Sequence, residues 1–165
     1  MPVPTVACVQ GVAAGAGASL ALNCDLVVAG QSAAFLQAFG KVGLLPDTGA
    51  TSLLPRLIGR ARSLGLMMLG DKLPAEEAQR MGLIWACVPD ADLGATVATL
   101  ANRLAAMPSR ALAQTRAAVD AAPHMPLEAL LAMEVRVQRE LGASADYQEG
   151  VAAFAAKRAP VFKDR

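Results

Sequence analysis

Charged side chains are scarce in this sequence, at 18% of 165 residues, and the two signs nearly cancel. Fifteen Lys and Arg stand against 14 Asp and Glu, which gives a formal net charge of +1. A nucleic-acid-binding domain normally carries a basic stripe, so this balance argues against a nucleic-acid partner. Intrinsic disorder is excluded as well, because it needs low hydrophobicity with high net charge, and here 55% of the residues are hydrophobic.

Cysteine and histidine are too few to build a disulfide framework or an ordinary metal site. The three cysteines, Cys8, Cys24 and Cys87, lie far apart and form no CxxC pair, which is typical of the reducing cytoplasm. The one histidine, His124, falls in a predicted loop. We therefore expect no metal, no separate cofactor and no histidine-dependent nucleophile.

Basic residues are missing from the first 40 positions, where Asp25 is the only charge. A signal peptide needs a positive start, and a membrane-spanning helix needs about 20 mainly apolar residues in a row. Pro2, Pro4, Gly11 and several further polar or glycine positions interrupt this stretch. We therefore expect a cytoplasmic protein without a membrane partner.

The pattern of the chain predicts an α/β front part, residues 1–105, and an all-helical back part, residues 106–165. Predicted strands cover residues 5–9, 26–29 and 83–88, and predicted helices cover residues 16–23, 51–58, 60–69 and 75–81. Two strands that flank a buried helix favour a parallel sheet. In the back part, one helix begins at Pro108-Ser109 and another at Pro126, and the second carries an apolar stripe of Leu130, Met133, Val137 and Leu141.

Glycines cluster in residues 11–18, directly after a predicted strand and at the start of a predicted helix. Such a turn can leave a backbone N–H free for an oxyanion or a phosphate. A dinucleotide-binding fingerprint is disfavoured, because Leu20 stands three places after Gly17, where a small residue is needed. Close packing of helix on strand remains an equally good interpretation of the glycines.

Asp47 is the first acidic residue after Asp25 and lies among the apolar residues of the segment 43–50. A partly desolvated carboxylate there would suit a general base. The same residue would also suit an N-cap of the helix that starts near Gly49, and spacing alone favours the cap. For Asp25, at a helix-to-strand junction, we expect a structural role.

Three motifs together resemble the enoyl-CoA hydratase/isomerase (crotonase) superfamily, and within it the branch of the phenylacetate-pathway epoxide isomerases. They are VQGVAAGAG at residues 9–17, NCD at 23–25 and GLLPDTG at 43–49. SADYQEG at residues 144–150 is equally typical of the family. The resemblance covers essentially the whole chain. It implies the C-terminal part of a spiral of ββα units, followed by helices that form a trimer or a dimer of trimers.

The resemblance also implies a site for an acyl-CoA thioester. The N–H of Ala16 would be one donor of the oxyanion hole, with Ala14, Gly15, Phe39 and Leu44 around the substrate. The two glutamates of typical hydratases fall on Ser19 and Phe39, whereas the aspartate of the isomerases falls on Asp47, which then becomes the expected proton-transfer group. Phe154 and Lys157, three apart on one predicted helix face, would reach the coenzyme A of a neighbouring subunit.

These implications favour an acyl-CoA isomerase over two alternatives. One is an enoyl-CoA hydratase, which the loss of both glutamates disfavours. The other is a non-catalytic assembly module, because the family's first strands, its adenine-binding loop and its second oxyanion donor all belong to a portion that precedes the strand near Pro4.

Overall fold

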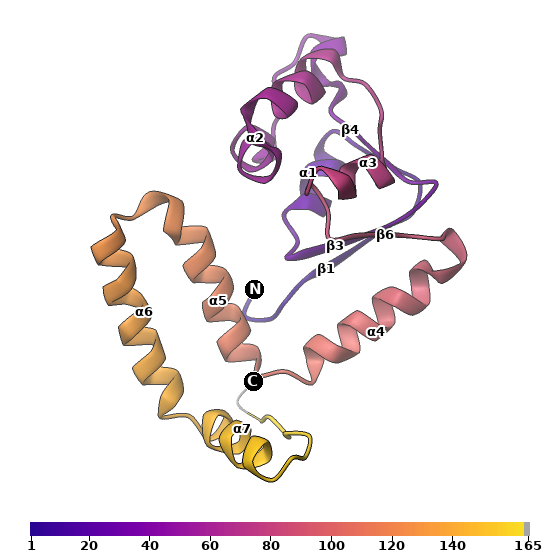
Figure 1. Cartoon of the computed structure of the whole chain (residues 1–165). Coiled ribbons are helices and arrows are strands. Elements are labelled where there is room, and N and C mark those ends of the chain that lie inside the picture. The colour runs from indigo at the N-terminus through magenta and orange to yellow at the C-terminus, as the bar shows by residue number, and fades with distance from the viewer. Residues whose placement is uncertain (164–165) are drawn as a thin grey trace. The chain divides into compact units, whose positions relative to one another are not determined.

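The structure is a computed structural model that describes residues 1–163. The chain forms two compact units, which we call the strand unit (Thr5–Thr99) and the helical unit (Met1–Pro4 with Leu100–Arg165). The division lies within helix α4 (Leu93–Ala105), whose end coincides with the end of the predicted front part. Figure 1 shows the strands β1, β3 and β6 of the strand unit side by side, and it shows α5, α6 and α7 of the helical unit.

Strands and short helices alternate in the strand unit. Its strands are β1 (Val6–Val9), β2 (Val12–Ala14), β3 (Leu26–Gly30), β4 (Ala34–Leu36), β5 (Leu73–Pro74) and β6 (Ala86–Val88). Its helices are α1 (Ala16–Leu22), η1 (Ala38–Val42), α2 (Ala50–Leu69), α3 (Ala75–Arg80) and η2 (Asp90–Asp92).

The six strands form two sheets that repeat along a spiral. One sheet has the order β1-β3-β6 and is parallel throughout, which confirms the predicted parallel sheet (Figure 1). In the other, β2 pairs with β4 in parallel and β4 pairs with β5 in antiparallel orientation. Val6 lies opposite Leu26 and Val12 opposite Ala34, so each ββα turn places its two strands beside those of the turn before.

The core of the strand unit lies between the sheets and the helices, and small residues dominate it. Ala18 and Leu22 of α1 and Leu54 of α2 are buried against Val27 and Phe35 of the strands. Alanine brings helix and strand close together, so the abundant small residues serve packing, and the burial of this apolar surface stabilises the unit.

The helix boundaries confirm most of the sequence prediction, including its separation of residues 51–58 from 60–69. Gly59 has φ 76° and ψ 161°, a conformation that only glycine adopts readily, and it breaks α2 into two helical stretches. The predicted strand at residues 83–88 is wrong in length, because only its last three residues pair with β3. Leu83 and Ile84 are instead buried in the core as a loop.

The helical unit contains the remainder of α4 and three further helices, α5 (Ser109–Ala121), α6 (Leu127–Gly142) and α7 (Ala145–Ala155), with a short 3₁₀ turn η3 (Ala122–His124). α5 and α6 pack as an antiparallel pair. On α6 the most buried positions include the predicted stripe, Leu130, Met133, Val137 and Leu141. Within residues 1–163, no helix combines the length and the apolar character that a bilayer crossing requires.

Candidate active site

A tight turn connects β2 to α1 and presents the backbone of Gly15 and Ala16. Gly15 has φ 53° and ψ −123°, which a side chain would disfavour, and its N–H donates to the Leu36 carbonyl at 2.7 Å. Ala16 is the first residue of α1, and within residues 1–163 its N–H has no hydrogen-bond partner. The structure thus leaves a free donor where the resemblance places one. Gly17 is not needed for close packing, because a Cβ there would meet nothing within 4 Å.

Phe39 lies directly over this turn. A Cβ built on Gly15 would stand 3.4 Å from Cζ of the Phe39 ring, so the ring covers the Gly15 backbone. Phe39 belongs to η1, and its carbonyl accepts the N–H of Leu44 at 2.9 Å. Leu44 itself is exposed, as is Ala14 at the end of β2. The structure therefore brings Gly15, Ala16 and Phe39 together and leaves Leu44 on the loop that continues towards Asp47.

Asp47 occupies neither of the environments that its sequence neighbours suggest. Its side chain is exposed, so the expected desolvation among apolar residues is wrong. The N-cap expectation is wrong too, because Gly49 caps α2 without any side-chain hydrogen bond. The physical reason is the backbone: Thr48 and Gly49 both have positive φ, at 53° and 79°, so a left-handed turn separates Asp47 from the start of α2 and Gly49 takes the N-cap position.

The Asp47 carboxylate is held locally and its loop touches α1. Oδ1 accepts the Thr48 hydroxyl at 2.8 Å, and the Asn23 amide, at the C-terminal end of α1, lies 3.5 Å from the Thr48 carbonyl. α1 thus has the free N–H of Ala16 at its start and the Asp47 loop near its end.

Asp25 has the structural role expected from its position. Its Oδ2 accepts the backbone N–H of Thr5 at 2.6 Å and the Thr5 hydroxyl at 2.8 Å. These bonds tie the start of β1 to the start of β3. They give Asp25 a structural task, as expected.

Sequence reasoning missed the buried polar pair beneath the turn. Ser19 and Gln37 are each only 1% exposed, and the Gln37 amide lies 3.5 Å from the Ser19 hydroxyl. The signal was present as a glutamine inside the otherwise apolar run at residues 33–39, because a buried amide in such a run needs a specific partner.

In the helical unit, Phe154 and Lys157 differ from expectation in one respect. α7 ends at Ala155, and Lys157 lies beyond it with φ 52°, so the two residues do not share a helix face. The helix ends early because the N–H groups of Lys157 and Arg158 turn back to the carbonyls of Phe154 and Ala153. Phe154 is 87% exposed, which leaves its ring available to a partner molecule.

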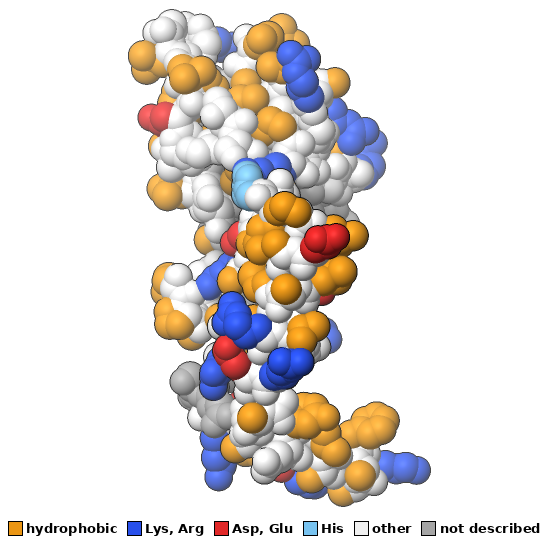
Figure 2. Space-filling model, turned by 90° about the vertical axis from the view of Figure 1, so that its left-hand side faces the viewer, with side chains coloured by type: hydrophobic (Ala, Val, Ile, Leu, Met, Phe, Trp, Pro, Cys, Tyr) orange, Lys and Arg blue, Asp and Glu red, His pale blue; other side chains and the backbone are white. Residues whose placement is uncertain are grey.

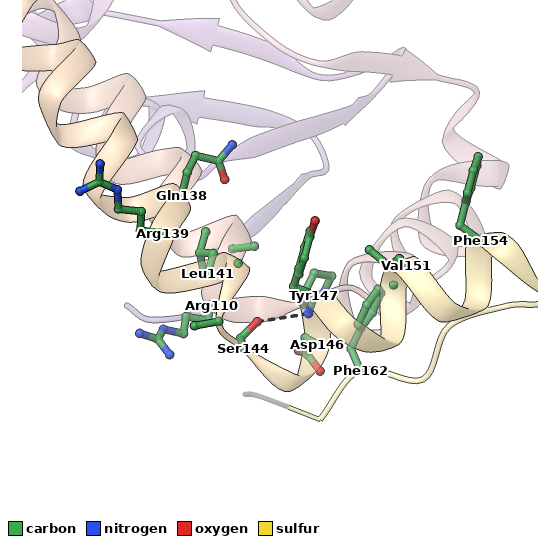
Figure 3. Close-up of a pocket in the computed structure, with 15 residues that line it drawn as sticks. Arg110, Gln138, Arg139, Leu141, Ser144, Asp146, Tyr147, Val151, Phe154 and Phe162 are labelled. Atoms are coloured by element: carbon green, nitrogen blue, oxygen red, sulfur yellow. Dashed lines mark hydrogen bonds between the residues drawn. The ribbon is translucent and has the colours of Figure 1, made fainter.

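Phe154 lies at one edge of a groove of about 990 Å³ that only residues of the helical unit line. In Figure 3, Tyr147 and Phe154 rise from the same side of α7, while Gln138 and Leu141 approach from the end of α6. Ser144 caps α7 by accepting the Tyr147 N–H at 3.2 Å, which fixes the start of the helix.

An ion pair holds the C-terminal segment against α7. Arg158 donates to both carboxylate oxygens of Glu149, and Glu149 also accepts the N–H of Val161 at 2.8 Å. The hydrogen bonds from Arg158 and then from Val161 lower the pKa of Glu149 to about 2. The Phe162 ring lies 3.7 Å from the Cβ position of Gly150, so the segment forms part of the groove wall.

Comparison with known proteins identifies the family of this chain. Residues 1–165 match the enoyl-CoA hydratase/isomerase family. A probable enoyl-CoA hydratase of Rhodobacter capsulatus is 52% identical over 99% of this chain and 64% of its own length. The 1,2-epoxyphenylacetyl-CoA isomerase of Escherichia coli is 49% identical over 98% of this chain and 62% of its own length.

Solved structures give the same result for the fold. A putative enoyl-CoA hydratase from Streptomyces coelicolor A3(2) superposes with a TM-score of 0.95 at 44% identity, over 99% of this chain and 60% of that one. An enoyl-CoA hydratase subunit from Geobacillus kaustophilus gives 0.93 at 38% identity, over 98% and 63%. The chain therefore spans less than two thirds of the length of these relatives. The resemblance seen in the motifs is confirmed, and the chain belongs to the enoyl-CoA hydratase/isomerase family with a crotonase-like fold.

Proposed function

We propose that the chain acts as an acyl-CoA isomerase, or as the part of one that carries the proton-transfer group and one oxyanion donor. The observation that carries the proposal is the set of groups around the turn. The positions that the resemblance assigns to the two hydratase glutamates hold a hydroxyl that is 1% exposed, Ser19, and a hydrocarbon ring, Phe39. Neither can transfer a proton as a carboxylate does.

Asp47 then supplies the one carboxylate that the reaction needs. Its oxygen would remove a proton from the carbon chain of the acyl group, and the electron pair of the broken C–H bond would move into the thioester carbonyl as an enolate. The same carboxyl would return the proton to a different carbon, which shifts the double bond without net loss or gain of atoms. Double-bond migration therefore requires a single acid–base group, and no separate cofactor enters.

The free N–H of Ala16 would stabilise the enolate oxygen. A preorganised backbone donor acts where the negative charge develops, and its removal from an oxyanion hole typically costs about 10²–10³ in rate. The Phe39 ring above Gly15 would exclude water from this region, while Ala14, Gly15 and Leu44 would line the approach of the thioester. Phe154 and Lys157 would contact the coenzyme A portion of a substrate held by a neighbouring subunit.

Hydration of an enoyl-CoA is the second candidate, and the relative with 52% identity, a probable enoyl-CoA hydratase, supports it. Hydration requires one group that activates water and a second that delivers a proton to carbon. We rank this function lower because Ser19 and Phe39 leave Asp47 without a carboxylate partner.

The first test is Asp47→Asn, which preserves the size of the side chain and abolishes its basicity. We expect turnover of a β,γ-enoyl-CoA to its conjugated isomer, followed by ultraviolet absorbance, to fall at least about 100-fold, at the lower end of the range for acid–base groups. Asp92→Asn, at an exposed carboxylate in η2, is the matched control and should leave turnover unchanged. Near-normal turnover of Asp47→Asn would refute the assignment.

A second test separates the two functions. The wild-type protein should convert a β,γ-enoyl-CoA to the conjugated isomer much faster than it adds water to that isomer. Both reactions are read from the same absorbance band, which isomerisation creates and hydration removes. Water addition at a rate equal to isomerisation would favour the hydratase instead.

A further inference from the structure

The peptide group between Gly15 and Ala16 has a free N–H on one side and a hydrogen-bonded carbonyl on the other. Its N–H is the free donor of Ala16, and its carbonyl is that of Gly15. This carbonyl accepts two hydrogen bonds from one residue, the backbone N–H of Ser19 at 3.1 Å and the Ser19 hydroxyl at 3.3 Å. The orientation of the carbonyl fixes the orientation of the N–H, because the peptide group is planar and trans.

Gln37 is the buried neighbour of the Ser19 hydroxyl. The Gln37 amide Nε2 lies 3.5 Å from the Ser19 oxygen, at the long end of a hydrogen bond in which the amide donates. A serine oxygen that accepts from Gln37 keeps its own hydrogen for the Gly15 carbonyl. The result is a chain of hydrogen bonds in which the Gln37 amide donates to Ser19 and the Ser19 hydroxyl donates to the Gly15 carbonyl.

The neighbour of Gln37 holds the other side of the same glycine. The Leu36 carbonyl accepts the Gly15 N–H at 2.7 Å, so the end of β4 fixes Gly15 through both a backbone and a side-chain route. Within residues 1–163, Oε1 of Gln37 is buried without a hydrogen-bond partner. An unpaired buried acceptor is unfavourable, and such departures from full pairing concentrate at functional sites.

We propose that Ser19 and Gln37 are positioning residues that aim and strengthen the Ala16 N–H as an oxyanion donor. Hydrogen bonds to a carbonyl polarise its peptide group, and a polarised peptide group has a stronger N–H donor. Ser19 is 1% exposed and acts through this peptide group without touching the substrate. The proposal rests on the proposed function in one respect, the use of the Ala16 N–H to stabilise an enolate.

The test uses acetoacetyl-CoA, a β-ketoacyl thioester whose enolate absorbs in the near ultraviolet. An oxyanion donor lowers the pH at which the bound ligand ionises, so the midpoint of this titration reports the donor directly and needs no proton transfer by Asp47. The titration is performed on the purified chain and its variants. Ligand-free protein gives a second measurement, the chemical shift of the Ala16 amide proton.

Three variants distinguish the effect of the Ser19 hydroxyl from an effect of side-chain packing. Ser19→Ala removes the hydroxyl, and Ser19→Thr keeps one that can bond to the carbonyl four residues earlier. The matched control is Ser63→Ala, because Ser63 is equally buried and its hydroxyl bonds to the Gly59 carbonyl, also four residues earlier, at 2.8 Å. That bond lies in α2 and does not involve the Gly15–Ala16 peptide.

We expect Ser19→Ala to raise the midpoint of enolate formation by about one pH unit, a loss of about tenfold in enolate stabilisation. Its kcat should fall by a similar factor, with KM nearly unchanged, because the interaction matters most in the transition state. The Ala16 amide proton should move upfield. Ser19→Thr should restore all three measurements towards wild type, and Ser63→Ala should match wild type throughout.

Two outcomes would overturn the proposal, and they differ in whether the proposed function fails with it. In the first, the wild-type protein lowers the titration midpoint of acetoacetyl-CoA, but Ser19→Ala changes neither this midpoint nor the chemical shift of the Ala16 amide proton. That result would refute the positioning role alone. In the second, the titration midpoint of acetoacetyl-CoA is the same with the wild-type protein as in free solution. That result would refute the use of the Ala16 N–H as an oxyanion donor, and the proposed function with it. Normal turnover of Asp47→Asn would refute the proton-transfer role and leave the Ser19 result standing.

Discussion

Lys157 occupies a backbone position that usually belongs to glycine. It follows the C-cap of α7, Ala156, and has φ 52°. A side chain in this left-handed region costs about 1–2 kcal/mol, partly offset by the greater freedom of glycine in the unfolded chain. Lys157→Gly should therefore raise the free energy of unfolding by about 0.5–1 kcal/mol, measured by thermal or chemical denaturation.

The control for this prediction is one residue away. Ala156 has ordinary right-handed geometry, φ −82° and ψ 0°, so Ala156→Gly relieves no backbone strain. It should destabilise the protein by about 0.5–1 kcal/mol, because glycine has more conformational freedom in the unfolded chain. Equal effects of the two glycine substitutions would show that Lys157 is not strained.

At the same scale, the sequence named candidate site residues, and their surroundings are where the structure differs from expectation. The glycines between a strand and a helix predicted that a backbone N–H could be free at the helix start, and the family resemblance assigned that donor to Ala16. The exposure of Asp47 depends on the left-handed turn at Thr48 and Gly49. A positive φ is uncommon for threonine and is imposed by the tertiary structure around the loop. The conformational propensity of the residue alone therefore could not predict it. The pairing of Ser19 with Gln37 joins residues 18 apart and needed the fold.

At the scale of elements, α2 offers a matched pair of glycines. Gly59 has φ 76° and ψ 161° between two helical stretches, whereas Gly65 has no positive φ and open space around its Cβ position. Gly59→Ala should destabilise the protein by about 1–3 kcal/mol, since alanine resists the Gly59 conformation. Gly65→Ala should stabilise it by about 0.5–1 kcal/mol. Chemical denaturation of both variants checks the prediction, and a stabilising Gly59→Ala would contradict it.

The segment that follows α7 should detach in acid. The pKa of Glu149 is lowered to about 2 by its hydrogen bonds to Arg158 and Val161. Because the folded pKa lies below the unfolded value of 4.5, the stabilisation is fully present above about pH 4.5 and is lost as the pH falls towards 2. The amide resonance of Val161 should therefore titrate with a midpoint near 2.

Glu149→Gln provides the neutral-pH version of this experiment. We expect faster hydrogen exchange at Val161, because the charged partner of Arg158 is lost. Glu140→Gln is the control, since Glu140 pairs only with Arg136 of the same helix among the described residues and should leave Val161 unchanged. A midpoint near 4.5 at Val161, or normal exchange in Glu149→Gln, would contradict the role of the ion pair.

The longer elements were predictable because their patterns are local. β1, α1, β3, the two stretches of α2 and the helices after Pro108 and Pro126 follow from periodicity and helix-start signals. The strands of the second sheet were not predicted from the local sequence pattern. Its strands β2, β4 and β5 have only two or three residues each, and they are strands because neighbouring turns of the spiral pair with them. No local pattern of that length distinguishes a strand from a loop.

At the scale of the whole molecule, α6 presents a second apolar row that the helical unit does not cover. Leu127, Leu131 and Val135 recur every four residues and are exposed, on a different side from the stripe that packs within the unit. Figure 2 looks towards the α6 side and shows hydrophobic side chains there beside Lys, Arg, Asp and Glu. Exposed apolar surface of this kind is costly to leave in water, so we interpret the row as a candidate association surface.

We expect the protein to self-associate through the helical unit, as a trimer or a dimer of trimers. Leu131→Glu should weaken the assembly, because it places a charge in the middle of the exposed row. Met68→Glu is the matched control, since Met68 is an exposed apolar residue of α2 in the strand unit. Light scattering at micromolar concentration measures both. A monomer mass for the wild-type protein would refute the assembly. Equal masses for the wild-type protein and Leu131→Glu would show that the interface does not include this row of α6.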